Sequence, residues 1–354
     1  MQADQSPPRG RGAADNPANR FEAIHYEIDP DVDESERPAP TTQFLKDTSR
    51  SIIATNDSPD VGFSASINPY RGCEHGCAYC YARPTHEYLG FSAGLDFESR
   101  IMVKFDAPEL LRSELSSPRW QPQVVAVSGV TDCYQPIERK LQLTRRCLEV
   151  LVEFRNPFAI VTKNHLVARD IDLLSEMSAF EAVAVFLSIN TLDGDLARDL
   201  EPRATRPDGR LAAIRELSEA GVPVGVMVAP VIPGLNDHEI PTILGAAAKA
   251  GAKSAGYIVL RLPHAVAPLF ERWLERHVPD KKERVLGRIR EMRGGRLNDP
   301  NFGSRMRGEG PFAEMFKKLF TLGCRKAGIG ERSFQLSTAS FRRPLEGQLP
   351  LFEN

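Results

Sequence analysis

The sequence contains little cysteine or tryptophan and no long apolar run. Six of its 354 residues are cysteine and two are tryptophan. So few cysteines in a chain of this length exclude a disulfide framework, which is typical of short secreted proteins. All apolar runs are shorter than the ~20 residues that a membrane-spanning helix needs. Because residues 1–20 also lack the apolar centre of a secretion signal, we expect a cytoplasmic protein without a membrane segment.

A large excess of one charge is also missing. The formal net charge is −2, which does not suit a protein that coats nucleic acid through charge alone. The charges are nevertheless unevenly distributed, with twelve acidic and six basic residues in 1–60 but nine basic and four acidic residues in 281–310. The basic segment is either a solvated, arginine-rich helix and loop or a patch that contacts phosphate.

Residues 1–60 lack sustained periodicity and are rich in Pro, Asp and Ser, so we predict a mostly disordered or loosely packed segment. From residue 63, apolar runs alternate with amphipathic stretches, which predicts six strand–helix units and a parallel sheet. The expected strands are 63–67, 123–129, 158–163, 181–190, 222–230 and 254–262, and the expected helices are 107–115, 137–154, 166–177, 208–221, 236–251 and 266–277. Periodicity alone does not separate a doubly wound sheet from an open barrel.

Beyond the last unit, residues 311–329 have apolar side chains on one helical face and charges on the other, which predicts an amphipathic helix packed on the main body. We therefore divide the chain into an N-terminal segment (1–60), a core (61–280) and a basic, helical C-terminal extension (281–354).

Half of the cysteines fall within eight residues in the spacing C-x3-C-x2-C, namely Cys73, Cys77 and Cys80. Gly72 and Gly76 give this loop the backbone freedom to wrap around a metal group. A structural zinc site needs four ligands, and His75, His86 or a distant thiol would have to complete it. An iron–sulfur cluster on three thiolates instead keeps one iron open for chemistry. The count of three favours the cluster.

The motif Cys73-x3-Cys77-x-Tyr79-Cys80 resembles the signature of the radical S-adenosylmethionine (radical SAM) enzymes. The longer string GCEHGCAYCYARP, residues 72–84, is similar to the spore photoproduct lyase-like branch of that superfamily. The resemblance covers most of the predicted core. It implies a partial (β/α)6 barrel, a [4Fe–4S] cluster on the three cysteines, and S-adenosylmethionine bound to the open iron.

In a βα barrel the functional residues lie at the C-terminal ends of the strands. The cysteine loop follows the first predicted strand, and polar or small residues follow the others. These are Ser128, Gly129, Thr131 and Asp132, then Lys163, Asn164 and His165, then Ser188 and Asn190, then Ala229 and Pro230, and finally Arg261. The strand bodies are apolar, so this pattern agrees with a barrel whose mouth carries the function.

The resemblance implies a role in cofactor binding for several of these residues. The matching segment VTK would place Lys163 at the carboxylate of S-adenosylmethionine, and SIN would place Ser188 and Asn190 at the ribose or carboxylate. The other implied contacts are the methionyl amine with Ser128, Gly129 and Thr131, and the adenine with Tyr79 and the backbone of Ala229. From the residues alone, Lys163 could also be a surface lysine, and Ser188 and Asn190 could satisfy a turn. Arg261 could contact substrate or form an ion pair.

The resemblance also implies the chemistry. A reduced cluster, supplied by an electron donor such as flavodoxin or ferredoxin, would cleave S-adenosylmethionine to methionine and a 5′-deoxyadenosyl radical, which takes a hydrogen atom from the substrate. In the lyase-like branch a cysteine near the second strand returns a hydrogen. Cys133 is the candidate here, although it follows Asp132 where the family cysteine precedes the acidic residue. The alternative for Cys133 is a small buried residue, and Cys147 and Cys324 fall in helical patterns.

The final stretch, Gln348–Phe352 (QLPLF), resembles the short peptide by which bacterial replication and repair proteins bind the DNA sliding clamp. Its leucine and phenylalanine side chains suit an apolar pocket, whereas a tail folded on its own domain is the alternative. Together with the basic segment, it directs the hypothesis to a radical SAM enzyme that acts on nucleic acid in a repair or lyase-like reaction. A radical SAM enzyme that modifies a protein or small molecule, and a zinc-binding, non-catalytic nucleic-acid adaptor, are the alternatives.

Overall fold

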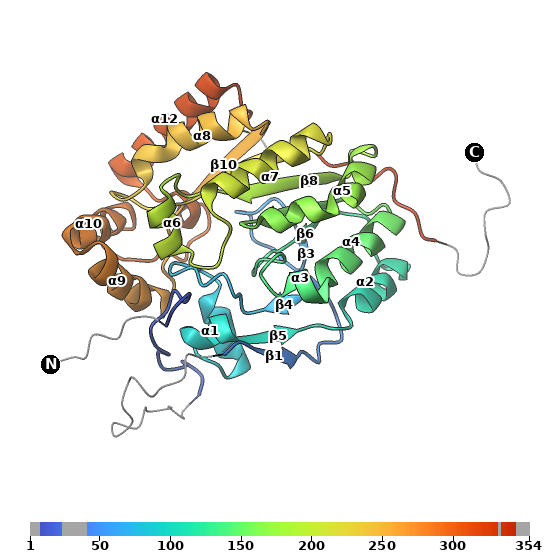
Figure 1. The fold of residues 1–354 in the computed structure, drawn as a ribbon, viewed down its shortest axis with the longest axis horizontal. Coiled ribbons are helices and arrows are strands. Elements are labelled where there is room, and N and C mark those ends of the chain that lie inside the picture. The colour runs from blue at the N-terminus through green and yellow to red at the C-terminus, as the bar shows by residue number, and fades with distance from the viewer. Residues whose placement is uncertain (1–7, 23–40, 332–333, 345–354) are drawn as a thin grey trace.

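The computed structural model describes residues 8–22, 41–331 and 334–344. Its main sheet has seven strands in the order β10-β9-β8-β7-β6-β3-β2 (Figure 1). Neighbouring strands run parallel, except that β2 pairs antiparallel to β3. The strands are β2 (Ile53–Thr55), β3 (Ala65–Ile67), β6 (Val125–Val127), β7 (Phe158–Thr162), β8 (Val183–Ser188), β9 (Val224–Val231) and β10 (Ser254–Val259).

The six parallel strands are neighbours in space in the same order as in the sequence. Each leads to a helix, and these helices are α2 (Ala107–Ser116), α4 (Leu143–Glu153), α5 (Ile171–Ser178), α7 (Pro207–Glu219), α8 (Ile240–Lys249) and α9 (Val266–His277). Among the described strands, β2 and β10 form the two edges, so the sheet does not close. The predicted partial (β/α)6 barrel is confirmed. A doubly wound sheet is excluded, because its strand order would reverse at a switch point.

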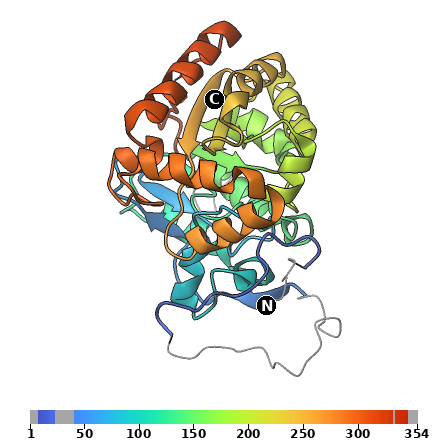
Figure 2. The same cartoon turned by 90° about the vertical axis from the view of Figure 1, so that its left-hand side faces the viewer.

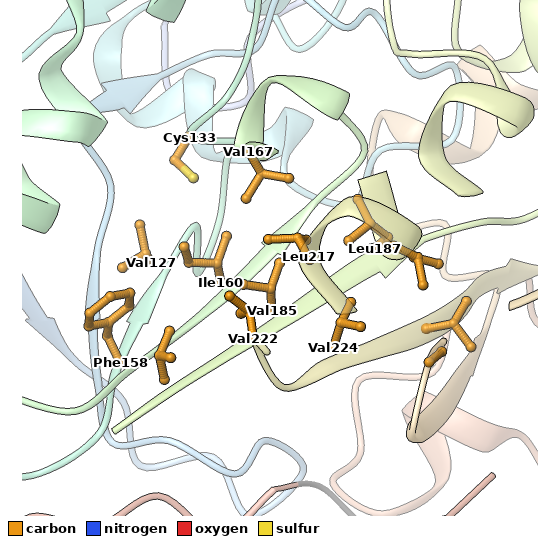
Figure 3. Close-up of a cluster of buried hydrophobic side chains, with 14 of the residues drawn as sticks. Val127, Cys133, Phe158, Ile160, Val167, Val185, Leu187, Leu217, Val222 and Val224 are labelled. Atoms are coloured by element: carbon orange, nitrogen blue, oxygen red, sulfur yellow. The ribbon is translucent and has the colours of Figure 1, made fainter. Parts of the chain in front are cut away.

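The core lies between the sheet and the surrounding helices. All six residues of β8 are buried, as expected for a parallel strand that is covered on both faces. Figure 3 shows Ile160, Val185 and Val224 from three neighbouring strands packed together, with Val167 and Leu217 from helical segments beside them. Apolar, β-branched residues suit this setting because they pack well on a pleated surface.

The helix expected over residues 137–154 is interrupted at Gln142, whose φ is 51°. The break produces α3 (Glu138–Leu141) and α4. Glu138 is buried, accepts a hydrogen bond from the Tyr70 hydroxyl at 2.5 Å, and accepts one from the Thr144 amide at 3.0 Å. A carboxylate at this position satisfies an amide in the first turn of α4 and interacts favourably with its dipole. The buried acid that begins α3 therefore also caps the start of α4.

A smaller sheet, in the order β1-β5-β4, lies beside the main one. It consists of β1 (Gln43–Lys46), β4 (Tyr70–Arg71) and β5 (Arg100–Val103). The described residues 8–22 also contact the body: the Asp15 carboxylate accepts a hydrogen bond from Arg272 on α9 at 2.9 Å. The described parts of the first 60 residues therefore pack against the core, and the boundary at residue 60 stays a prediction.

The C-terminal extension contributes α10 (Lys282–Met292), α11 (Ser304–Arg307) and α12 (Gly310–Ala327). The amphipathic helix packs on the main body as expected, and α12 contacts α8 (Figure 2). The Phe320 ring lies 4.7 Å from that of Tyr257 on β10. The predicted clamp-binding peptide, Gln348–Phe352, lies outside the described residues.

The remaining helical segments are short, and they are η2 (Arg83–Leu89), α1 (Leu95–Ser99), η3 (His165–Asp170), α6 (Gly194–Leu200), η4 (Asp237–Glu239) and η5 (Pro279–Lys281). Within the described residues, no helix has the length and apolar character needed to cross a membrane.

Candidate active site at the cysteine loop

The cysteine loop begins after β4 and runs into η2. All three of its thiols are free, those of Cys73 and Cys77 are buried, and Cys80 is half-buried. Gly72 and Gly76 have φ values of 83° and 67°, in the left-handed region that favours glycine. A Cβ atom at Gly76 would lie 2.8 Å from a carboxylate oxygen of Glu98. The expectation that both glycines allow the loop to turn is therefore confirmed.

A buried ion pair fixes the outer side of this loop. The Arg83 guanidinium donates to the Cys77 carbonyl at 2.8 and 3.0 Å and pairs with Glu98. Glu98 also accepts the backbone amides of Gly12 and Ala13 at 3.0 and 2.9 Å. A Cβ atom at Gly12 would lie 1.7 Å from the Gly76 carbonyl oxygen, so residue 12 lies directly against the loop. Because the pair is hydrogen-bonded on both sides, it holds the loop backbone in one conformation.

The chemistry of the three thiols suits a cluster. Burial raises the pKa of Cys73, Cys77 and Cys80 above the usual value of a thiol. Their ionised form therefore needs a positive partner, and bound metal ions provide one because coordinated thiols lose their protons.

The residues around the loop do not suit a single zinc ion. Among the described residues, no three His, Cys, Asp or Glu side chains are arranged to hold one metal ion. His75, a candidate fourth zinc ligand, is engaged on both ring nitrogens: Nε2 lies 3.2 Å from Asn164 Nδ2, and Nδ1 lies 3.4 Å from an Asp132 oxygen. His86 Nε2 lies 2.9 Å from the Arg100 carbonyl oxygen. An iron–sulfur cluster takes each thiolate on a different iron and needs no such convergence.

A charged network lies beside the loop and is centred on Glu201, which follows α6 and is buried. Its carboxylate accepts hydrogen bonds from the Tyr79 hydroxyl and the Arg210 guanidinium, and Lys163 Nζ lies 3.6 Å away. Lys163 also donates to the Ala229 carbonyl at 3.3 Å. Burial alone would raise the pKa of Glu201, but the positive charges of Arg210 and Lys163 lower it overall, so the carboxylate stays ionised.

The sequence did not reveal Glu201 or Arg210. Both stand in a stretch, residues 194–210, whose many charges are typical of a solvated surface. The burial of these two residues marks them as functional candidates, and this burial is visible only in the tertiary structure. Arg210 also donates to the Ser188 carbonyl at 2.8 Å. The network therefore connects the residue after β7 with the C-terminal parts of β8 and β9.

The predicted site residue Asn190 is 1% exposed, and neither polar atom of its side chain has a partner among the described residues. An unpaired amide at this depth is costly unless something else binds it.

The loop after β6 brings three more predicted residues next to the cysteines. Ser128 has a φ of 79°, and its hydroxyl donates to the Thr131 carbonyl at 2.7 Å. The Gly129 carbonyl accepts a hydrogen bond at 3.2 Å from Tyr81, the residue after Cys80. Ser128, Gly129 and Thr131 therefore lie in a loop that contacts the end of the cysteine loop.

Two other residues at the strand ends have structural roles. Asp132 accepts hydrogen bonds from the Thr162 hydroxyl at 2.7 Å and the Lys163 amide at 2.8 Å, so it joins the loop after β6 to β7. His165 forms a half-exposed pair with Glu216 at 2.9 Å.

Cys133 follows Asp132, and its backbone amide donates to the Ser128 hydroxyl at 3.3 Å. It is 1% exposed and belongs to the main hydrophobic core, where Figure 3 shows it near Val127 and Val167. Burial raises the pKa of its thiol well above the usual value. The expected role as a hydrogen donor needs a thiol that faces the substrate. The observed burial agrees with the alternative, a small packed residue, and the donor role of Cys133 stays a prediction.

Comparison with known proteins identifies the class. The model of the radical SAM superfamily matches residues 67–247. An uncharacterized protein of Mycobacterium tuberculosis is 37% identical over 260 residues, which are 72% of this chain and 75% of that protein. The chain belongs to the radical SAM superfamily. It is a radical SAM enzyme, and its cofactors are a [4Fe–4S] cluster and S-adenosylmethionine. This excludes the zinc-binding, non-catalytic adaptor.

Among solved structures, the chain shares its fold with spore photoproduct lyase. The solved structure of spore photoproduct lyase with a dinucleoside spore photoproduct has a TM-score of 0.58 and 17% identity, and covers 81% of this chain and 80% of that one. This likeness establishes the shared fold. A radical SAM Nα-GlyT isomerase of Pseudomonas phage M6 is 30% identical over 180 residues, which are 50% of this chain and 35% of that protein.

Proposed function

We propose that Cys73, Cys77 and Cys80 hold the iron–sulfur cluster, each on a different iron. The observation that carries this proposal is the loop itself, in which three free thiols stand on eight residues fixed by the Arg83–Glu98 pair. When bound, the cluster and S-adenosylmethionine would supply reductive cleavage to methionine and a 5′-deoxyadenosyl radical. The electron would come from a small donor protein such as flavodoxin or ferredoxin.

We infer that the residues around the loop bind S-adenosylmethionine. Asn190 offers an amide whose two polar atoms lack partners in the described chain. Lys163 offers an ammonium group for the carboxylate, and the ionised Glu201 holds that group in place. The remaining contacts of the proposal are the methionyl amine with Ser128, Gly129 and Thr131, a ribose or carboxylate contact with Ser188, and the adenine with Tyr79 and the Ala229 backbone.

We propose nucleic acid as the substrate class. Two observations support it: the excess of basic residues in 281–310, and the dinucleoside that the solved spore photoproduct lyase holds in the same fold. Phosphate groups are bound mainly through such basic residues. The alternative, modification of a protein or small molecule, has no specific observation in its favour.

We also propose three units, 1–60, 61–280 and 281–354. The match to the family model, residues 67–247, lies inside the second unit. The third carries the basic segment and ends in the predicted clamp-binding peptide, so the extension would bring the barrel to its substrate.

The test is anaerobic reconstitution with iron and sulfide. We expect the wild-type protein to take up iron, to show the visible absorption of a cluster, and to release 5′-deoxyadenosine when it is reduced with S-adenosylmethionine. A Cys77→Ala variant should lose all three properties, because one iron loses its ligand. Cys324→Ala, which removes a buried thiol on α12, is the matched control and should keep them. An iron-loaded Cys77→Ala variant with full cofactor cleavage would overturn the ligand assignment.

The substrate class is tested separately. Oligonucleotides labelled with deuterium at carbon would be added to the reduced holoenzyme, and deuterium would be sought in the released 5′-deoxyadenosine. Transfer supports nucleic acid. Transfer from a peptide library, with none from any oligonucleotide, would contradict it.

A further inference from the structure

Three arginines meet where β10 ends, close to the cysteine loop. Arg293 donates to the Leu260 carbonyl at 2.6 Å and to the Arg305 carbonyl at 3.2 Å. Arg261 lies next to Leu260 in the sequence, and its guanidinium is 5.5 Å from the ring centroid of Tyr81, the residue after Cys80. Two segments of the C-terminal extension therefore bring basic residues to the edge of the predicted active site.

These arginines are incompletely neutralised. The Arg305 guanidinium pairs with Asp60, whereas no ion pair of Arg261 or Arg293 occurs within the part of the chain that the structure describes. The Nε atoms of Arg261 and Arg293 are buried and have no hydrogen-bond partner among the described residues. The whole Arg293 residue is only 5% exposed. Buried donors of this kind are rare unless a ligand completes them.

Mutual repulsion strengthens this argument. Burial, followed by the charge of Arg305, lowers the pKa of Arg261. Burial lowers the pKa of Arg293 to about 10. Asp299 lies near both Arg261 and Arg293 and offsets part of the charge, but its carboxylate is also engaged by the Ser304 hydroxyl and the Asn301 amide. An added anion would relieve the repulsion that remains.

Exposed aromatic rings border the arginines. Phe302 is 58% exposed, and the Arg305 guanidinium lies 4.4 Å from its ring centroid. Tyr81 is 48% exposed beneath Arg261. Aromatic faces beside arginine forks are typical of surfaces that bind single-stranded nucleic acid, because bases stack on the rings while the guanidinium groups bind phosphate.

We propose that Arg261, Arg293 and Arg305 bind a phosphodiester of the substrate, and that Tyr81 and Phe302 offer stacking faces to the adjacent bases. This inference rests on the proposed function and names the subsite through which nucleic acid would be held. Because Arg261 lies over the residue that follows Cys80, a phosphate bound here would hold its nucleotide beside the cysteine loop.

The test measures binding of a fluorescent single-stranded oligonucleotide to the reconstituted holoenzyme at several salt concentrations. We expect Arg261→Gln to weaken affinity about tenfold and to lower the slope of log affinity against log salt by about 1. Arg119→Gln is the control with the same change in charge. Arg119 is exposed in the loop before β6, at the opposite ends of the strands, and its replacement should change neither value.

A second variant separates lost charge from disturbed packing. Arg261→Lys keeps the charge but not the two-pronged donor, so it should lose affinity while keeping the salt slope of the wild type. An Arg261→Gln protein with wild-type affinity and slope, or an Arg261→Lys protein whose slope falls as in Arg261→Gln, would overturn the proposal. If the wild-type holoenzyme binds no oligonucleotide, the proposed substrate class itself fails, and this result is distinct from failure of the subsite.

Discussion

The Arg83–Glu98 pair and the strand ends both border the cysteine loop, and their buried polar groups differ in whether they have partners. On the outer side, Arg83 and Glu98 are fully buried and every contact they make is to the chain itself. On the side of the strand ends, Asn190 and Arg261 carry buried polar atoms with no partner among the described residues. Satisfied groups fix a backbone, whereas unsatisfied ones mark positions where a ligand is expected.

The largest effect is expected when the buried Arg83–Glu98 ion pair is removed. Glu98→Ala leaves the Arg83 guanidinium buried without its counter-charge and should lower the free energy of unfolding by about 3–5 kcal/mol. Denaturant unfolding of the reconstituted protein measures this change in the free energy of unfolding. Glu314→Ala, on the exposed side of α12, is the control and should change stability by less than about 0.5 kcal/mol. A loss below about 1 kcal/mol for Glu98→Ala would mean that the pair does not hold the loop.

A pair of buried asparagines sharpens the comparison directly. Asn156 donates to the carbonyls of Gln123 and Pro157 at 3.1 and 3.0 Å and accepts from Trp120, whereas the Asn190 side chain has no described partner. Asn156→Ala should therefore cost about 1–3 kcal/mol of stability, because it leaves buried groups unpaired. Asn190→Ala should cost less stability but weaken S-adenosylmethionine binding about tenfold.

Calorimetric titration of S-adenosylmethionine into both reconstituted variants, together with their unfolding curves, checks the two expectations. Equal losses of cofactor affinity in the two variants would show that Asn190 is no more a ligand-binding residue than the structural Asn156.

The last expected effect is a dependence of stability on pH from His86, whose Nδ1 is buried without a partner among the described residues. Burial lowers the pKa of His86 from 6.5 to about 4. Between these values the unfolded chain binds more protons than the native one, so stability falls as pH decreases from about 6.5 toward 4, by at most about 1.4 kcal/mol per pH unit. The difference in stability between wild type and His86→Gln, measured across this range, should shrink as the pH is lowered. A constant difference would show that His86 titrates alike in both states.

The fold could be predicted from the sequence because its signals are local. Alternating apolar runs and amphipathic stretches predicted six strand–helix units, and the resemblance to the radical SAM signature implied a barrel rather than a doubly wound sheet. The break at Gln142, whose φ is 51°, was not predicted, because the apolar spacing of residues 137–154 continues across it.

The site was predicted less completely, for a similar reason. Lys163 and Asn190 could be found because they follow apolar strands. Glu201 and Arg210 stand among other charges, and their burial appears when helices and strands come together. Cys133 also follows a strand end, and its side chain is buried in the core, which its position after the strand did not indicate. Position along a strand therefore predicts the neighbourhood of a residue but not the direction of its side chain.

The contact of residues 8–22 with the body has a consequence for the order of assembly. Asp15 meets Arg272 across 257 residues of sequence, so this contact forms after most of the chain has been synthesised. Contacts between such distant residues carry a large entropic cost of loop closure and form late in folding. Since Gly12 lies against the cysteine loop in the same segment, we expect the loop to reach its final packing only after α9 has been synthesised.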